Sequence, residues 1–103
     1  MKKFVLGLFL LIPVLLSGCL TPSEQDRAVQ LCVQACQLAK QNGTDLSNGP
    51  CLSNEIIPGW VCDVAHSPRL PVDDQPENQC PAYGLTAKHF VEVDPECKFI
   101  RAA

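Results

Sequence analysis

The chain has 103 residues, a formal net charge of −3, 47% hydrophobic residues and seven cysteines. This length accommodates one small domain. The excess of acidic over basic side chains argues against nucleic acid as a partner and against electrostatic attachment to anionic lipid.

The first 19 residues have the layout of an export signal. Lys2 and Lys3 precede an apolar run over residues 4–16, and two small residues then stand before a cysteine. A basic start, an apolar core and small residues at the cleavage point are typical of a secretory signal peptide. The run ends in Leu16-Ser17-Gly18-Cys19, which resembles the lipobox of prokaryotic lipoproteins.

The resemblance implies a lipoprotein whose signal peptide, residues 1–18, is removed. It also implies that Cys19 carries a thioether-linked diacylglycerol, with acyl chains such as palmitate, and two or three chains hold a protein durably on a membrane. The expected location is the cell membrane or the outer membrane, on the extracytoplasmic side of the cell envelope. Leu20 after the lipidated cysteine resembles the pattern of lipoproteins sent to the outer membrane.

Two alternatives to a cleaved lipoprotein signal are ordinary secretion and a retained membrane anchor. Residues 4–16 in helical form would reach roughly 20 Å at about 1.5 Å per residue, short of the ~30 Å hydrocarbon core. Pro13 would also interrupt that helix near its end. A retained anchor is therefore disfavoured, and lipid is the expected tether.

Residues 19–22 are predicted to be a lipidated N-terminus and short spacer, and residues 23–103 a disulfide-rich domain. Removing Lys2 and Lys3 with the signal leaves six basic against 11 acidic side chains. An even number of cysteines in a short exported domain is typical of disulfides, because the core of so small a domain is modest. The six cysteines of the domain are Cys32, Cys36, Cys51, Cys62, Cys80 and Cys97.

A metal site is the alternative use of these cysteines. None of them has the Cys-x-x-Cys spacing of zinc knuckles or of thioredoxin-like redox sites. Only His66 and His89 are present as histidine ligands. We therefore expect three disulfides, no metal and no cofactor.

The strongest local signal is a helix that begins after Ser23. Serine is a favoured N-cap, Glu24 suits the positive end of the helix dipole, and Gly43 supplies a stop. Cys32 and Cys36 lie four residues apart on the apolar face, where Cβ atoms are about 5 to 6 Å apart and a disulfide needs ~3.8 Å. The two cysteines are therefore expected to bond to different partners.

Three short strands are predicted after the helix. Residues 60–65 alternate, with Trp60 on the inward side, and residues 88–93 and 98–101 form a hairpin around a type I turn at Asp94-Pro95. The expected fold is therefore α+β: a small disulfide-rich domain with one N-terminal helix packed on a short three-stranded antiparallel sheet.

The segments between these elements are predicted to be loops. Residues 42–59 carry turn residues and are pinned at Cys51, and residues 67–79 form an exposed acidic, proline-rich loop closed by Cys80. Of the pairings that sequence leaves open, we favour Cys32–Cys62, Cys36–Cys51 and Cys80–Cys97. The first pair follows from the inward position of Cys62, and the second from the early return of Cys51 after the helix.

Five side chains carry groups that bind metal or transfer protons: Asp63, His66, Asp73, Asp74 and His89. No spacing among them is diagnostic of a site. Asp63 is expected to pair with Arg69 in the turn that follows it. The possible binding residues are therefore Asp63, His66 and Arg69, and no catalytic residue is named.

The function expected from these observations is a non-catalytic, lipid-anchored module that is structural or binds a protein partner in the envelope. No motif for a serine nucleophile, a phosphate loop or a zinc protease is present. The alternative is an inhibitor or ligand-binding lipoprotein acting on extracytoplasmic hydrolases, because residues 67–71 form a stiff loop with a central arginine of the kind that trypsin-like proteases accept. A metal-dependent enzyme comes third. The aromatic residues Trp60, Tyr83, Phe90 and Phe99 are assigned to the core rather than to a binding patch.

Overall fold

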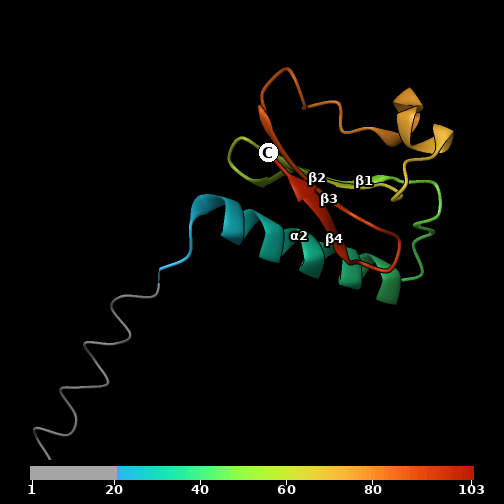
Figure 1. Cartoon of the computed structure of the whole chain (residues 1–103), viewed down its shortest axis with the longest axis horizontal. Coiled ribbons are helices and arrows are strands. Elements are labelled where there is room, and N and C mark those ends of the chain that lie inside the picture. The colour runs from blue at the N-terminus through green and yellow to red at the C-terminus, as the bar shows by residue number, and fades with distance from the viewer. Residues whose placement is uncertain (1–20) are drawn as a thin grey trace, which may run out of the picture.

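The computed structural model describes residues 21–103, and its architecture is α+β (Figure 1). The predicted signal peptide and the lipidated Cys19 lie outside the described residues. One long helix lies on one face of a single four-stranded sheet (Figure 1). The elements are α2 (Glu24–Gln41), β1 (Cys51–Ile57), β2 (Trp60–Val64), β3 (His89–Val93) and β4 (Phe99–Ala102).

The helix follows its predicted limits. Ser23 is the N-cap, and its hydroxyl accepts a hydrogen bond from the backbone N–H of Asp26 at 3.0 Å. After Gln41 the chain turns at Gly43, whose φ of 84° favours glycine. Ala28, Cys32 and Cys36 are the fully buried residues of α2 and pack on the sheet. Among the described residues, no helix is long and apolar enough to cross a membrane.

The sheet corrects the predicted three-stranded antiparallel arrangement. Its order is β1-β2-β3-β4, and β2 and β3 are parallel, whereas the β1–β2 and β3–β4 pairs are antiparallel. Residues 65–88 provide the crossover that a parallel pair requires. The predicted hairpin of the last two strands is confirmed.

The additional strand is β1, where the sequence predicted a loop. Its centre, Ser53-Asn54-Glu55, is polar, and its pairing with β2 has irregularities on both sides of Ser53. Such a bulged, polar strand is typical of a sheet edge and lacks the alternation that marks a strand in a sequence. Gly59, with φ of 85°, closes the turn into β2.

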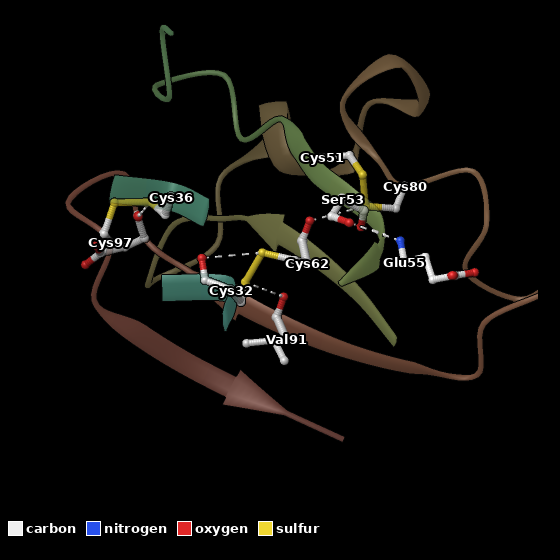
Figure 2. Close-up of a disulfide and its surroundings, with 10 residues drawn as sticks. Cys32, Cys36, Cys51, Ser53, Glu55, Cys62, Cys80, Val91 and Cys97 are labelled. Atoms are coloured by element: carbon white, nitrogen blue, oxygen red, sulfur yellow. Dashed lines mark hydrogen bonds between the residues drawn. A yellow bond between two sulfur atoms is a disulfide. The ribbon is translucent and has the colours of Figure 1, made fainter. Parts of the chain in front are cut away.

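Three disulfides cross-link the described chain, and one of the predicted pairs is confirmed (Figure 2). Cys32 bonds to Cys62, so the helix is attached to the central strand β2 as predicted. The other two predicted pairs are wrong: Cys36 bonds to Cys97 and Cys51 bonds to Cys80.

The register of β1 gives the reason for this correction. Cys51 pairs with Asp63 in β2, and directly paired residues point to the same face of a sheet. Asp63 alternates with Cys62, which points towards the helix, so Cys51 points away from the helix. Cys36 therefore bonds to Cys97, in the turn between β3 and β4.

The segment over residues 67–79 is not simply an exposed loop. It forms two short 3-10 helices, η1 (Pro71–Asp74) and η2 (Pro76–Asn78), on the side of the sheet opposite α2 (Figure 1). Asp73 is only 2% exposed and anchors the segment, because its Oδ2 accepts hydrogen bonds from the backbone N–H groups of His66 and Leu70.

The sheet therefore has residues packed on both faces. On the helix side, the main core contains the fully buried Val64, Val91 and Val93 together with the Cys32–Cys62 bond. On the other side, which we call the outer face, a smaller cluster joins Val61 to residues of the crossover. The functional candidates lie on this outer face.

Candidate functional site

A row of charged side chains crosses the outer face. Asp63 of β2 pairs with Glu92 of β3, and Glu92 pairs with Arg101 of β4. Paired residues on neighbouring strands point to the same face and lie within side-chain reach. The register therefore brings two carboxyl groups and one guanidinium together, and we call Asp63, Glu92 and Arg101 the outer row.

Glu92 is buried and lies between two arginines. Its Oε2 accepts a hydrogen bond from Arg69 at 2.9 Å, and its Oε1 accepts one from Nε of Arg101 at 2.7 Å. A buried carboxylate requires such partners because burial removes the water that would otherwise stabilise its charge. Glu92 thus fixes both guanidinium groups on the outer face.

Arg69 has different partners from those predicted. Its Nε donates to Asp74 at 2.8 Å, and a third nitrogen donates to the backbone carbonyl of Asp73 at 3.4 Å. Together with the bond to Glu92, these contacts occupy all three guanidinium nitrogens. The predicted direct bond to Asp63 is absent from the described residues, because Glu92 and Asp74 hold the guanidinium instead.

Asp63 is the member of the outer row without a matched cation. Its Oδ1 atom is buried and has no hydrogen-bond partner within residues 21–103. Burial, followed by the charge of Glu92, raises the pKa of Asp63 to about 7, although Arg69 acts in the opposite direction. Asp63 therefore changes its charge near neutral pH.

A cavity of about 260 Å³ opens over the outer row. Its aromatic wall consists of Tyr83 and Phe90, whose rings meet edge to face with centroids 5.6 Å apart. The guanidinium carbon of Arg101 lies 5.4 Å from the centroid of Phe90. The full lining is Val61, Asp63, Arg69, Gln79, Cys80, Tyr83, Phe90, Glu92 and Arg101.

His66 lies beside this cavity rather than in it. A smaller depression of about 190 Å³ adjoins the first, and His66 lines it together with Arg69, Glu92 and Arg101. The Nδ1 atom of His66 is 2.9 Å from Oδ1 of Asp73. Burial raises the pKa of Asp73, but the hydrogen bonds from Leu70 and His66 outweigh burial and hold that pKa below its usual value.

The five predicted metal or proton-transfer residues do not converge. His66 pairs with Asp73, but His89 stacks on Trp60 with ring centroids 4.6 Å apart, on the helix side of the sheet. Within the part of the chain that the structure describes, no three histidine, cysteine or acidic side chains are arranged to hold a metal ion.

The aromatic prediction is confirmed for Trp60, which is buried in the core and donates its indole N–H to Glu24 at 2.6 Å. It is wrong for Tyr83 and Phe99, which are about half exposed. Tyr83 instead forms part of the cavity wall together with Phe90.

Glu92 and Arg101 belong to the site but were not predicted from the sequence. One signal could have found Glu92: it is a charged residue between Val91 and Val93, within an apolar strand. A charge at such a position is buried only when paired, so it implies nearby cations. Nothing in the local sequence identifies those cations as Arg69 and Arg101.

A functional interpretation of this chain rests on the geometry of the outer face, because comparisons with known proteins found no match. No protein-family model, no curated protein and no solved structure matches the chain. The site that can be argued from the structure is the cavity on the outer face, with its fixed arginines and the unmatched carboxyl group of Asp63.

Proposed function

We propose that this protein is a lipid-anchored, extracytoplasmic module that binds a protein partner through the outer face of its sheet. The observation that carries the proposal is the cavity of about 260 Å³, whose charged groups are held in place by the ion pairs of Glu92 on a covalently cross-linked sheet. Preorganised polar groups beside an aromatic wall are typical of a binding site.

Two features support the extracytoplasmic location. The lipobox-like Leu16-Ser17-Gly18-Cys19 favours export and lipidation. The three disulfides of the domain favour an oxidising compartment, because cytoplasmic proteins rarely keep such bonds. The two features are independent, since one lies in the leader and the other in the fold.

The tether would keep the domain close to the lipid. Only residues 20–22 separate Cys19 from the N-cap Ser23, and the four steps between the Cα atoms of Cys19 and Ser23 would span at most about 14 Å if fully extended. The start of α2 and the C-terminus lie at the same end of the domain (Figure 1). That end would therefore be nearest the membrane, and the outer face, opposite α2, would be open to other envelope proteins.

Glu92 and its two arginines are arranged for recognition rather than for catalysis. Both oxygens of Glu92 accept hydrogen bonds from arginine, and Arg69 uses all three of its nitrogens. These groups hold each other in place and offer a fixed pattern of charge. Arg69 is thus held against the sheet, so we place the binding surface at the cavity and not at an arginine-bearing inhibitor loop.

The location is tested by lipid labelling of the full-length protein in a bacterial host. Wild type should incorporate an alkyne-tagged palmitate and fractionate with membranes, and Cys19→Ser should lose both properties. Labelling of Cys19→Ser at the wild-type level would show that the anchor is elsewhere.

The binding surface is tested by site-specific photo-crosslinking in living cells of the native host. A benzoylphenylalanine at Tyr83, on the cavity wall, should yield a discrete crosslinked product. The same group at Leu38, which is exposed on the opposite side of the domain in α2, serves as the matched control and should not yield that product. Identical products from both positions, or none from Tyr83, would contradict the proposed surface.

A further inference from the structure

The charges on the outer face do not balance around Asp63. Arg69 and Arg101 both pair with Glu92, and Arg69 also pairs with Asp74. Within residues 21–103, none of the ion pairs includes Asp63, and its buried Oδ1 atom has no hydrogen-bond partner. When Asp63 is ionised, the outer face therefore carries one carboxylate that a cation from another molecule could neutralise.

The groups around Asp63 make this region attractive to a cation. Glu92 faces it from β3, Asp73 and Arg69 from the crossover, and Arg101 lies beyond Glu92 on β4. On the neighbouring strand β1, the residue paired with Asp63 is Cys51, which carries no charge because it is in a disulfide. With Asp74 included, four carboxyl groups face two guanidinium groups, and the imidazole of His66 lies against Asp73.

The cavity restricts the kind of cation that fits. Asp63 is partly exposed and lines the cavity, while Oδ1 is buried, so at most one of its two carboxyl oxygens is open to the cavity. A guanidinium binds a carboxylate best through two parallel hydrogen bonds, whereas an ammonium group is a compact charge that needs only one acceptor. A single open oxygen therefore favours an ammonium group.

The remaining lining suits the chain that carries such a group. Tyr83 and Phe90 form an aromatic wall, and Val61 and the Cys80 side of the Cys51–Cys80 bond add apolar surface. A four-carbon side chain would bury its methylene groups against this wall while its charge reaches Asp63. An anionic ligand would instead meet arginines that carboxylates already neutralise.

We propose that the cavity on the outer face binds the ammonium group of a lysine side chain of the partner protein, with Asp63 as its counter-ion. The inference rests on the proposed protein-binding function and names the group that the site recognises. Nothing covalent occurs: the ammonium group donates hydrogen bonds to the open oxygen of Asp63, and the aromatic wall holds the methylene groups.

The chemistry of Asp63 predicts a specific pH dependence. Only the ionised carboxylate can neutralise the ammonium group, and the pKa of Asp63 lies at about 7 before ligand binds. A single group with that pKa is mostly protonated at pH 5.5 and mostly ionised at pH 8.5, so binding should be about 30-fold weaker at the lower pH. Lysine is charged at both values.

The test uses the mature, oxidised lipoprotein in detergent and follows its backbone resonances by NMR. The probe is Nα-acetyl-lysine amide, and Nα-acetyl-norleucine amide is the uncharged control. We expect the lysine derivative to shift resonances near Asp63 at pH 8.5, with about 30-fold weaker binding at pH 5.5. No binding at pH 8.5, equal binding at both pH values, or equal binding of the norleucine derivative would overturn the proposal.

Two variants assign the effect to Asp63. Asp63→Asn keeps the shape of the side chain and should weaken binding at pH 8.5 at least tenfold, with no remaining pH dependence. Glu77→Gln removes one negative charge from an exposed position outside the cavity and should bind like wild type. The Trp60 indole N–H resonance reports that each variant is folded, and an unchanged affinity in folded Asp63→Asn would exclude Asp63 as the counter-ion.

Two further comparisons separate the possible outcomes. Tighter binding of the lysine derivative than of n-butylammonium indicates a protein side chain as the source of the ammonium group, and the reverse order would exclude that source. Crosslinking from Tyr83 in cells that express Asp63→Asn distinguishes the two proposals. A partner captured equally by this variant would leave the binding function intact and refute the role of Asp63. Lysine binding without any captured partner would refute the protein-binding function, and with it a partner's lysine as the ligand, but would leave Asp63 as the counter-ion of an ammonium group.

Discussion

Replacing Asp63 with asparagine should stabilise the domain above neutral pH. The pKa of Asp63 is raised from 3.8 to about 7, chiefly by burial and then by Glu92. Between these two values the unfolded chain has lost the proton while the folded chain retains it. The free energy of unfolding therefore falls as the pH rises through this range, and the contribution of the protonated carboxyl group is lost above pH 7.

The size of the expected stabilisation follows from the raised pKa of Asp63. One pKa unit corresponds to about 1.36 kcal/mol, so a rise from 3.8 to about 7 sets an upper limit of about 4 kcal/mol. Asp63 is partly exposed, and solvent screening lowers the expected effect to about 2 kcal/mol. In a domain of this size that corresponds to a change in melting temperature of roughly 8 to 16 °C.

The assay is thermal unfolding of the oxidised protein, followed by circular dichroism at pH 4 and pH 8. Asparagine resembles the protonated carboxyl group in shape and cannot ionise, so Asp63→Asn should melt near wild type at pH 4 and well above it at pH 8. Glu77→Gln controls for the change in net charge. A variant less stable than wild type at pH 8, or an equal gain in Glu77→Gln, would refute the reasoning.

Glu92 offers a second check on the same cause. Its charge is the second contribution to the raised pKa of Asp63. Glu92→Gln removes this charge and should lower the pKa of Asp63, which a carbon NMR titration of the carboxyl group measures directly. An unchanged midpoint would show that Glu92 does not act on Asp63.

Two further predictions concern the frame of the domain. Cys32→Ala with Cys62→Ala should lower the free energy of unfolding in urea by about 2 to 5 kcal/mol, and by more than Cys51→Ala with Cys80→Ala. The two bonds span 30 and 29 residues, so the difference reflects the complete burial of Cys32 and Cys62, and equal losses would contradict this account. Gly49→Ala should lower the melting temperature more than Gly43→Ala, because both glycines have positive φ but only at Gly49 would a Cβ atom meet Asp73, with Oδ1 at 2.5 Å. Similar melting temperatures in the two alanine variants would argue that Asp73 yields to the added carbon.

The helix could be predicted because its signals are local. Ser23, the acidic first turn and Gly43 act within one or two turns of the backbone, and the apolar face repeats at helical spacing. The Cys32–Cys62 bond followed, since both residues occupy inward positions of strongly patterned elements. Local signals were therefore sufficient for the helix and for the inward position of its cysteines.

The parts that could not be predicted depend on contacts between distant segments. The polar centre of β1 hides a strand, and the register of that strand directs Cys51 to the outer face and hence to Cys80. The parallel pairing of β2 and β3 likewise depends on how residues 65–88 cross the outer face. No periodicity in the sequence carries this information.

The same distinction between local signals and distant contacts applies to the residues of the candidate site. Asp63 and Arg69, predicted as possible binding residues, both line the cavity, but the expected bond between them gave way to Glu92, which reaches Arg69 across 23 residues of sequence. His66 is held by Asp73 at the edge of the site. Once Glu92 binds both Arg69 and Arg101, Asp63 is left without a cation, and this consequence is visible only when the three strands are aligned.

The unmatched carboxyl group is the strongest argument that the outer face has a role beyond folding. Asparagine or an apolar residue at position 63 would remove the penalty of about 2 kcal/mol estimated above for ionised Asp63, and it would leave the Glu92 pairs intact. Side chains with such perturbed ionisation cluster at functional sites, where local stability is given up for recognition or chemistry. Here the penalty falls on a group that lines a cavity with an aromatic wall, and a cation from a partner is the species that would remove it.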